Sequence, residues 1–155
     1  MSVTNQKSTQ ATNHDAVPKV QLDWYDLGFT VHGARVTSTQ SGAGDANSTM
    51  LLQYVPANKL ILPHLSKLYT TDFGTGETLD VGTATDEDLF ASAVDVATAA
   101  TSFYLDEAHD ISAAATDLSN GVLTTAETAI YAKCEAAAYT DGAKVNGFIY
   151  FGEPK

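Results

Sequence analysis

The segment from Leu68 to Phe90 reads LYTTDFGTGETLDVGTATDEDLF, and its glycines decide how the rest of the chain is interpreted. Gly74 and Gly76 have the spacing of the first two glycines of a phosphate-binding loop. A dinucleotide-binding fingerprint also needs a third glycine at a fixed offset and a helix directly after it, and a P-loop needs Gly-Lys followed by Ser or Thr. The segment contains neither pattern. We therefore predict a tight turn, in which both glycines adopt backbone angles that other residues avoid.

The residues that follow this turn have the alternating pattern of a β-strand. In Glu77–Gly82, apolar and polar side chains occupy successive positions. Successive side chains of a strand point to opposite faces of the sheet, so Leu79 and Val81 are expected to face the core. Thr78 and Asp80 are expected to face outward.

A cation site is the alternative interpretation of the same segment. Asp72, Glu77 and Asp80 supply oxygen donors that lie close together in the sequence. Their spacing does not match the calcium-binding loop of an EF-hand. We therefore predict no metal ligands and no cofactor, and a cation between Asp72 and Asp80 stays an open alternative.

Similar alternation recurs along the chain and predicts several short strands separated by turns. Within Thr49–Val55 it places Met50, Leu52 and Tyr54 on one face. A proline is tolerated only at the edge of a sheet or at a bulge, so Pro63 should interrupt one strand. Roughly six to eight short strands are typical of a sandwich or small barrel, so we predict an all-β domain, jelly-roll-like or barrel-like, with one short helix. The other predicted strands are Ala34–Gln40, Lys59–Phe73, Glu77–Gly82, Thr101–Ala108 and Val145–Gly152.

Two segments have mixed signals. Thr85–Ala100 begins with a threonine and three acidic residues, which is typical of a helix N-terminus and predicts the short helix there. Thr124–Tyr139 is rich in alanine and starts as Thr-x-x-Glu, a possible helix cap, but it also alternates. Asp141-Gly142 then precedes the strand-like Val145–Gly152, and an Asp-Gly pair between two alternating segments favours a β-hairpin.

The N-terminal part of the chain differs in composition from the rest. Residues 1–17 are polar and aperiodic, which indicates an arm that a partner could order, and we place a flexible arm at 1–30 and a single β-rich domain at 31–155. Aromatic and large apolar residues gather at the end of the arm. These residues either pack on the domain's own core or dock on a neighbouring subunit. We predict an interface anchor formed by Trp24, Tyr25, Leu27 and Phe29.

Charge and hydropathy exclude two kinds of partner. The 155 residues include 8 Lys and Arg against 19 Asp and Glu, for a formal net charge of −11. This negative field repels phosphate backbones, so we expect no nucleic-acid partner. No apolar run approaches the length of a membrane span, so we expect no membrane partner either.

The side chains that most often carry catalysis are isolated in the sequence. The four histidines, His14, His32, His64 and His109, lack the spacing of a metal site, and no nucleophile elbow is present. Cys134 lies within a predicted strand and is interpreted as a buried thiol. We therefore predict that the chain is not an enzyme, although two of its carboxylates could still meet as a glycosidase-like pair.

Two segments carry a resemblance to a known family. They are VPANKLILPHLSKLYTTDFGTGETLDVGTATDEDLFASAVDVATA, residues 55–99, and AIYAKCEAAAYTDGAKVNGFIYF, residues 129–151. The succession of strand, Gly-Thr-Gly turn, TLDVG, an acidic-alanine segment and a closing GFIYF resembles the capsid decoration (cement) proteins of tailed bacteriophages. The resemblance covers about two thirds of the chain, and its motifs are structural.

The resemblance implies a function in adhesion. A protein similar to this family would bind the major capsid protein on the outer surface of an icosahedral virion, as a homotrimer or other small cluster that bridges capsomers. No catalytic residue comes with the resemblance. Two alternatives stay open: a head–tail or tail component, and a carbohydrate-binding β-sandwich on the virion that uses Tyr54, Tyr69, Tyr104 and Tyr131 as stacking platforms.

Overall fold

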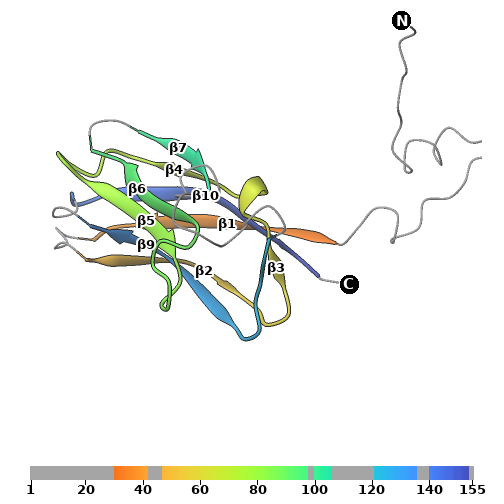
Figure 1. Cartoon of the computed structure of the whole chain (residues 1–155). Coiled ribbons are helices and arrows are strands. Elements are labelled where there is room, and N and C mark those ends of the chain that lie inside the picture. The colour runs from red at the N-terminus through yellow and green to blue at the C-terminus, as the bar shows by residue number, and fades with distance from the viewer. Residues whose placement is uncertain (1–29, 42–46, 98–99, 106–120, 136–139, 154–155) are drawn as a thin grey trace, which may run out of the picture. The chain divides into compact units, whose positions relative to one another are not determined.

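The computed structural model describes residues 30–41, 47–97, 100–105, 121–135 and 140–153, which form a β-sandwich of two sheets (Figure 1). The predicted all-β fold is confirmed, whereas the predicted boundary between residues 30 and 31 stays a prediction because residues 1–29 lie outside the described part. The elements are β1 (Val31–Thr39), β2 (Thr49–Val55), β3 (Leu60–Ile61), the 3-10 helix η1 (Pro63–Leu65), β4 (Lys67–Thr70), β5 (Thr78–Gly82), β6 (Ala91–Asp95), β7 (Ser102–Tyr104), β8 (Val122–Leu123), β9 (Thr128–Cys134) and β10 (Lys144–Gly152).

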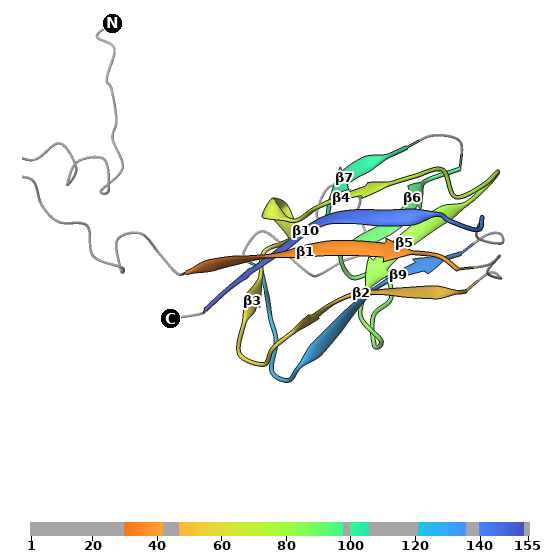
Figure 2. The ribbon, with the colours of Figure 1, turned by 180° about the vertical axis from the view of Figure 1, so that it is seen from behind.

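Strand β10 is the centre of the six-stranded sheet. β1 pairs antiparallel with β10 over its whole length, from Val31 opposite Gly152 to Thr39 opposite Lys144. The other edge of β10 pairs with β4 and then with β3, while β7 lies beyond β4 and β8 lies beyond β3. Figure 2 shows this sheet from its outer side, with β10 between β1 and β4.

The predicted interruption at Pro63 explains why one edge of β10 pairs with two strands. Pro63 begins η1, so the segment divides into β3 before it and β4 after it. Ser66 closes this bend, because its hydroxyl donates to the backbone oxygen of Leu62 at 2.8 Å and accepts from the backbone N–H of Tyr150 at 2.9 Å. The bend is thereby attached to β10.

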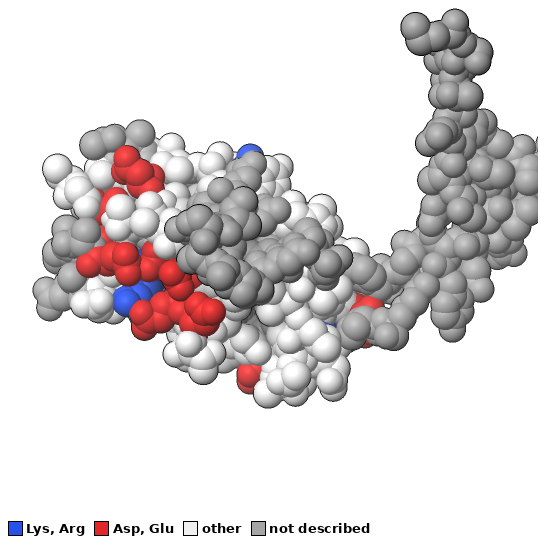
Figure 3. All heavy atoms as spheres, in the orientation of Figure 1, with Lys and Arg blue, Asp and Glu red and all other residues white. Residues whose placement is uncertain are grey.

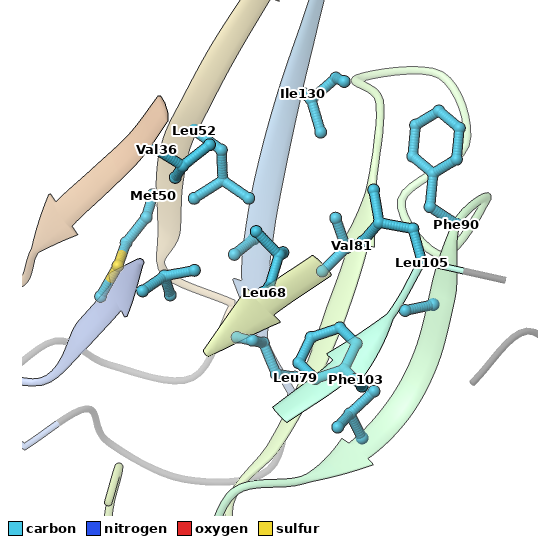
Figure 4. Close-up of a cluster of buried hydrophobic side chains, with 14 of the residues drawn as sticks. Val36, Met50, Leu52, Leu68, Leu79, Val81, Phe90, Phe103, Leu105 and Ile130 are labelled. Atoms are coloured by element: carbon cyan, nitrogen blue, oxygen red, sulfur yellow. The ribbon is translucent and has the colours of Figure 1, made fainter. Parts of the chain in front are cut away.

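The second sheet has four strands in the order β2-β9-β5-β6. Its inner face packs on the inner face of the six-stranded sheet, and side chains from both sheets form one core (Figure 4). Cys134 is a fully buried cysteine on β9, as predicted. The largest fully buried apolar side chains of this core are Phe73, Phe90, Ile61, Leu68, Leu79, Leu105, Ile130, Ile149, Val36 and Val55.

The Gly-Thr-Gly segment forms the predicted turn. Gly74 and Gly76 have φ angles of 112° and 79°, which glycine adopts readily. The side chain of Asp72 accepts a hydrogen bond from the N–H of Gly74 at 2.8 Å, and the N–H of Glu77 donates to the oxygen of Gly74 at 3.3 Å. The segment therefore connects β4 to β5. A phosphate-binding loop would instead lead into a helix.

The predicted hairpin between Thr124–Tyr139 and Val145–Gly152 is wrong. The Asp141-Gly142 turn does form, with a φ of 81° at Gly142, but β9 and β10 belong to different sheets. β2 and β5 occupy both edges of β9, so no edge is left for β10. The turn instead carries the chain from one sheet to the other.

The predicted helix within Thr85–Ala100 is also wrong. After a loop, the chain forms β6, which pairs with β5, and the backbone N–H of Phe90 donates to the oxygen of Val81 at 2.9 Å. This pairing buries Phe90, Ala91 and Val96 completely. The gain from burying them outweighs the weak helical preference of the alanines.

Tyr54 differs from the predicted pattern of facing, and Asp80 differs from it in its burial. The pairing of β2 with β9 shifts between Leu51 and Gln53, and this β-bulge turns Tyr54 outward and Val55 inward. Asp80 lies on the opposite face of β5 from Leu79 and Val81, as expected, yet it is only 3% exposed because neighbouring segments cover it.

Candidate functional site

The outer face of the six-stranded sheet carries a continuous row of large side chains. Arg35 on β1 lies opposite Phe148 on β10, Phe148 lies opposite Lys67 on β4, and Lys67 lies opposite Tyr104 on β7. Directly opposed side chains on one face of a sheet lie close enough to touch. The row therefore crosses four neighbouring strands without a gap.

A second row runs parallel to the first and lies two residues away from it on each strand. It places Tyr69 on β4 opposite Asn146 on β10, and Ser102 on β7 opposite Tyr69. Phe148 and Tyr69 are 45% and 48% exposed, which is unusually open for side chains of their size. We call the surface formed by Arg35, Lys67, Tyr69, Tyr104, Phe148 and Tyr150 the aromatic–basic face.

The alternation of each strand explains why these side chains share one face. Their neighbours in the sequence, Val36, Leu68, Phe103 and Ile149, are buried in the core. Successive residues of a strand point in opposite directions, so burying these neighbours turns the aromatic and basic residues toward solvent.

Contacts within the aromatic–basic face hold its side chains in place. The ammonium of Lys67 lies 4.8 Å from the ring centroid of Tyr104 and 5.4 Å from that of Tyr69, which are cation–π distances. The rings of Phe148 and Tyr150 lie with their centroids 6.2 Å apart. Gly33 on β1 leaves room for the ring of Tyr150, since a Cβ atom there would approach Cε1 of Tyr150 to 2.8 Å.

The charges of the six-stranded sheet all have one sign. None of its six strands, each of which the structure describes in full, contains Asp or Glu. They do contain Arg35, Lys67 and Lys144. In a chain with a net charge of −11, the strands of this sheet therefore carry only positive charges.

The outer side of the four-stranded sheet is acidic, as Figure 3 shows. A pocket of about 460 Å³ opens there. Lys133 on β9 is the basic residue among these acids, and its ammonium pairs with the carboxylate of Glu87. The pocket is lined by Asp80, Ala84, Thr85, Asp86, Glu87, Asp88 and Glu135.

Asp80 lies at the base of the acidic pocket. Burial raises its pKa to about 6, and a hydrogen bond with the carboxyl group of Glu135 and the negative charges of Glu135 and Asp88 act in the same direction. The backbone N–H of Ala93 donates to Oδ1 of Asp80 at 2.7 Å and opposes the rise in pKa. Ala93 has a φ of 50°, so the bond is made by a backbone position in the left-handed region.

We expect Asp80→Asn to stabilise the protein at neutral pH and to leave its stability at pH 4 unchanged. The pKa of Asp80 is higher in the folded than in the unfolded chain, so the folded state holds the proton more tightly, and stability falls as the pH rises from about 4 to about 6. Asparagine keeps a side-chain oxygen that accepts from the N–H of Ala93, but it does not titrate. We therefore expect the variant's free energy of unfolding at pH 7.5 to be about 1–3 kcal/mol higher than that of the wild type. Urea unfolding at both pH values measures the difference. A variant that is less stable at pH 7.5 would contradict the assignment.

The structure does not bring together the three carboxylates of the alternative cation site. Asp72 accepts from the Gly74 N–H, Glu77 is fully buried and Asp80 faces the acidic pocket. Among the described residues, no group of three or more His, Cys, Asp and Glu is placed to hold a metal ion. The open alternative of a cation between Asp72 and Asp80 therefore gains no support from their placement.

Of the four histidines, the structure describes two. The ring of His32 stacks on that of Phe151 with centroids 5.9 Å apart, and His64 lies in η1.

The predicted anchor residues Trp24, Tyr25, Leu27 and Phe29 lie outside the described residues. The anchor therefore stays a prediction.

The four tyrosines named as stacking platforms do not form one surface. Tyr69 and Tyr104 lie on the paired strands β4 and β7, whereas Tyr54 and Tyr131 lie on β2 and β9 of the other sheet.

The sequence did not identify four residues of the aromatic–basic face: Arg35, Lys67, Phe148 and Tyr150. The alternation in KLYT and GFIYF signals which of these share a face of their own strand, but only the pairing of β10 with β1 and β4 brings them together.

No helix in the described part of the chain has the length and apolarity that crossing a membrane requires.

Comparison with known proteins shows a shared fold. A chain of the Cyanophage Pam1 capsid asymmetric unit superimposes with a TM-score of 0.58 and 17% sequence identity, over 99% of this chain and 100% of that one. A chain from the capsid of Ralstonia phage GP4 superimposes with a TM-score of 0.58 and 19% identity, over 81% of this chain and 85% of that one. No protein-family model matches the sequence. No curated protein matches it significantly either.

At such low identity, these similarities concern the fold alone. The class they define is a single-chain β-sandwich whose backbone arrangement is also found in chains of two phage capsid structures. The aromatic–basic face and the acidic pocket are features of this chain's own side chains.

Proposed function

We propose that this chain is a structural virion protein that binds the outer surface of a tailed-phage icosahedral capsid and cements its capsomers. The observation that carries the proposal is the shared fold, which extends over the full length of a chain in the Cyanophage Pam1 capsid asymmetric unit. The Ralstonia phage GP4 capsid contains a chain with a similar fold. The resemblance of residues 55–99 and 129–151 to decoration proteins supports the same function.

The proposed mechanism is binding without a chemical reaction. A protein that buries surface across the boundary between capsomers binds the assembled shell and not its separated parts, so its binding free energy stabilises the assembly. The acidic net charge of −11 favours the outside of the shell, because the inside faces packaged DNA.

We propose that the arm contributes an anchor to this binding. An arm that orders on a partner loses conformational entropy, and the burial of large aromatic side chains compensates for that loss. Self-association as a homotrimer would place three anchors on one lattice site and strengthen binding through multivalency. The proposed anchor residues are Trp24, Tyr25, Leu27 and Phe29.

The experiment that tests this function is an add-back to shells that lack the chain. Shells assembled from the major capsid protein encoded with it are mixed with the wild-type chain or with Trp24→Ala and then pelleted. We expect the wild-type chain to saturate the outer lattice and Trp24→Ala to reduce occupancy at least tenfold, since interface tryptophans are frequent hot spots. The melting temperature of the isolated variant should equal that of the wild type. A variant that unfolds would instead make Trp24 part of the core.

Other results would favour the alternative functions. If the wild-type chain binds no shell and purified particles contain only a few copies at one vertex, the chain is a head–tail or tail component. If it binds neither shells nor tails but retains a glycan on an array, the carbohydrate-binding interpretation replaces the proposal. If the chain has the proposed function, the number of its copies in purified virions is proportional to the number of capsomers.

A further inference from the structure

We propose that the aromatic–basic face is the surface that docks on the shell, against a patch of the shell's outer surface lined by carboxylates. This inference rests on the proposed function and adds to it the orientation of the bound protein. With the aromatic–basic face on the shell, the acidic pocket of the four-stranded sheet points away from it toward solvent.

The distribution of charge supports this orientation. Arg35, Lys67 and Lys144 lie on strands that contain no acidic residue, whereas Asp86, Glu87, Asp88 and Glu135 gather around the pocket on the other sheet. The two sheets pack through their inner faces, so their outer faces point in opposite directions. A carboxylate-lined patch attracts the first face and repels the second, which selects one orientation.

The side chains of the aromatic–basic face are of the kinds that dominate binding energy at interfaces. Tyrosine and arginine are enriched among hot spots, and aromatic rings bury a large area while they lose few rotatable bonds. Lys67 is already held between two tyrosine rings, so docking costs little further ordering of its side chain. Phe148 and Tyr69 expose nearly half of their surface and have this surface left to bury.

A second copy of this chain is the rival occupant, since its acidic pocket also complements the aromatic–basic face. The two surfaces, however, lie on opposite sides of one sandwich. Repeating such a contact adds each copy to the outer side of the last, which builds an open chain and no closed ring. A shell surface that occupies the aromatic–basic face ends this growth, so we assign the face to the shell.

The test compares two double variants with closely matched side chains on the two sheets. Tyr69→Ser with Phe148→Ser removes two exposed residues of the aromatic–basic face, which are 48% and 45% exposed. Tyr54→Ser with Leu51→Ser removes two residues of β2 that are 51% and 41% exposed. Affinity is measured for the full chain on shells assembled from the major capsid protein encoded with it.

We expect the variant of the aromatic–basic face to bind on the order of 100-fold more weakly, and the β2 variant to stay within about threefold of wild type. Both should keep the wild-type melting temperature. Single Lys67→Glu should weaken binding roughly tenfold, while Lys67→Arg, which keeps the charge over the tyrosine rings, should not. Binding of the wild type should also weaken as salt concentration rises.

Three results would overturn the inference. The first is a loss of binding by the β2 variant with normal binding by the variant of the aromatic–basic face. The second is an equal loss by both double variants. The third is a change in the oligomeric state of Tyr69→Ser/Phe148→Ser without shells, measured by sedimentation, because the face would then contact a second copy. If the wild-type chain binds no shell at all, the proposed function fails, which is a separate outcome.

Discussion

Gly147→Ala is expected to destabilise the domain by about 3–5 kcal/mol, which is a large part of the stability of a typical domain. Gly147 lies on β10 between Val36 of β1 and Leu68 of β4, with a φ of 150°. A Cβ atom there would lie 2.2 Å from the backbone oxygen of Lys67 and 3.0 Å from the Cα atom of Leu68. Backbone atoms of a paired strand cannot move aside without breaking the β4–β10 pairing.

The matched control for this variant is Gly76→Ala. Gly76 also has a positive φ, 79°, but apart from the glycine itself and its two chain neighbours no atom lies within 4 Å of the position that a Cβ would occupy. Its replacement should cost only the backbone strain, about 1–2 kcal/mol. Urea unfolding of both variants separates the two contributions. Equal losses in the two variants would show that strain alone matters and that the close approach of β4 to β10 does not.

Phe90→Ala is expected to cost about 3–5 kcal/mol, because it leaves a cavity in the core. Phe90 is fully buried and directly precedes β6, at the end of the loop that lines the acidic pocket. The exposed Phe148 provides a control with the same change of side chain, and its replacement by alanine should cost less than about 1 kcal/mol. The free energies of unfolding of the two variants check the difference. Losses of similar size would mean that Phe90 does not pack in the core.

Gly147→Ala and Phe90→Ala change features of the fold that sequence patterns predict to different degrees. Alternation predicts most of the strands, and the turn residues predict the Gly-Thr-Gly and Asp-Gly turns, because both signals depend only on neighbours in the sequence. The helix predicted for Thr85–Ala100 fails because the pairing of β6 with β5 is decided by residues far away along the chain. The β-bulge that turns Tyr54 outward likewise arises from the pairing of β2 with β9.

The candidate site was predictable only in fragments. Tyr69 and Tyr104 are identifiable as strand aromatics, but nothing in their spacing shows that β4 and β7 pair. The predicted hairpin even assigned Val145–Gly152 to the wrong partner, and with it the neighbours of Phe148. Arg35 lies opposite Phe148, from which it is separated by more than a hundred residues in the sequence. A surface assembled from four strands requires the complete topology before its members can be identified.

The position of β10 also affects how the protein is made. This strand lies at the centre of the six-stranded sheet and pairs with β1, β3 and β4, yet it follows all the other strands in the sequence. While the ribosome synthesises the earlier strands, β1 and β4 have no partner between them, and the apolar inner faces remain open. The sheet can close only after Gly152 has left the ribosome, so we expect the nascent chain to expose apolar surface that favours aggregation until then.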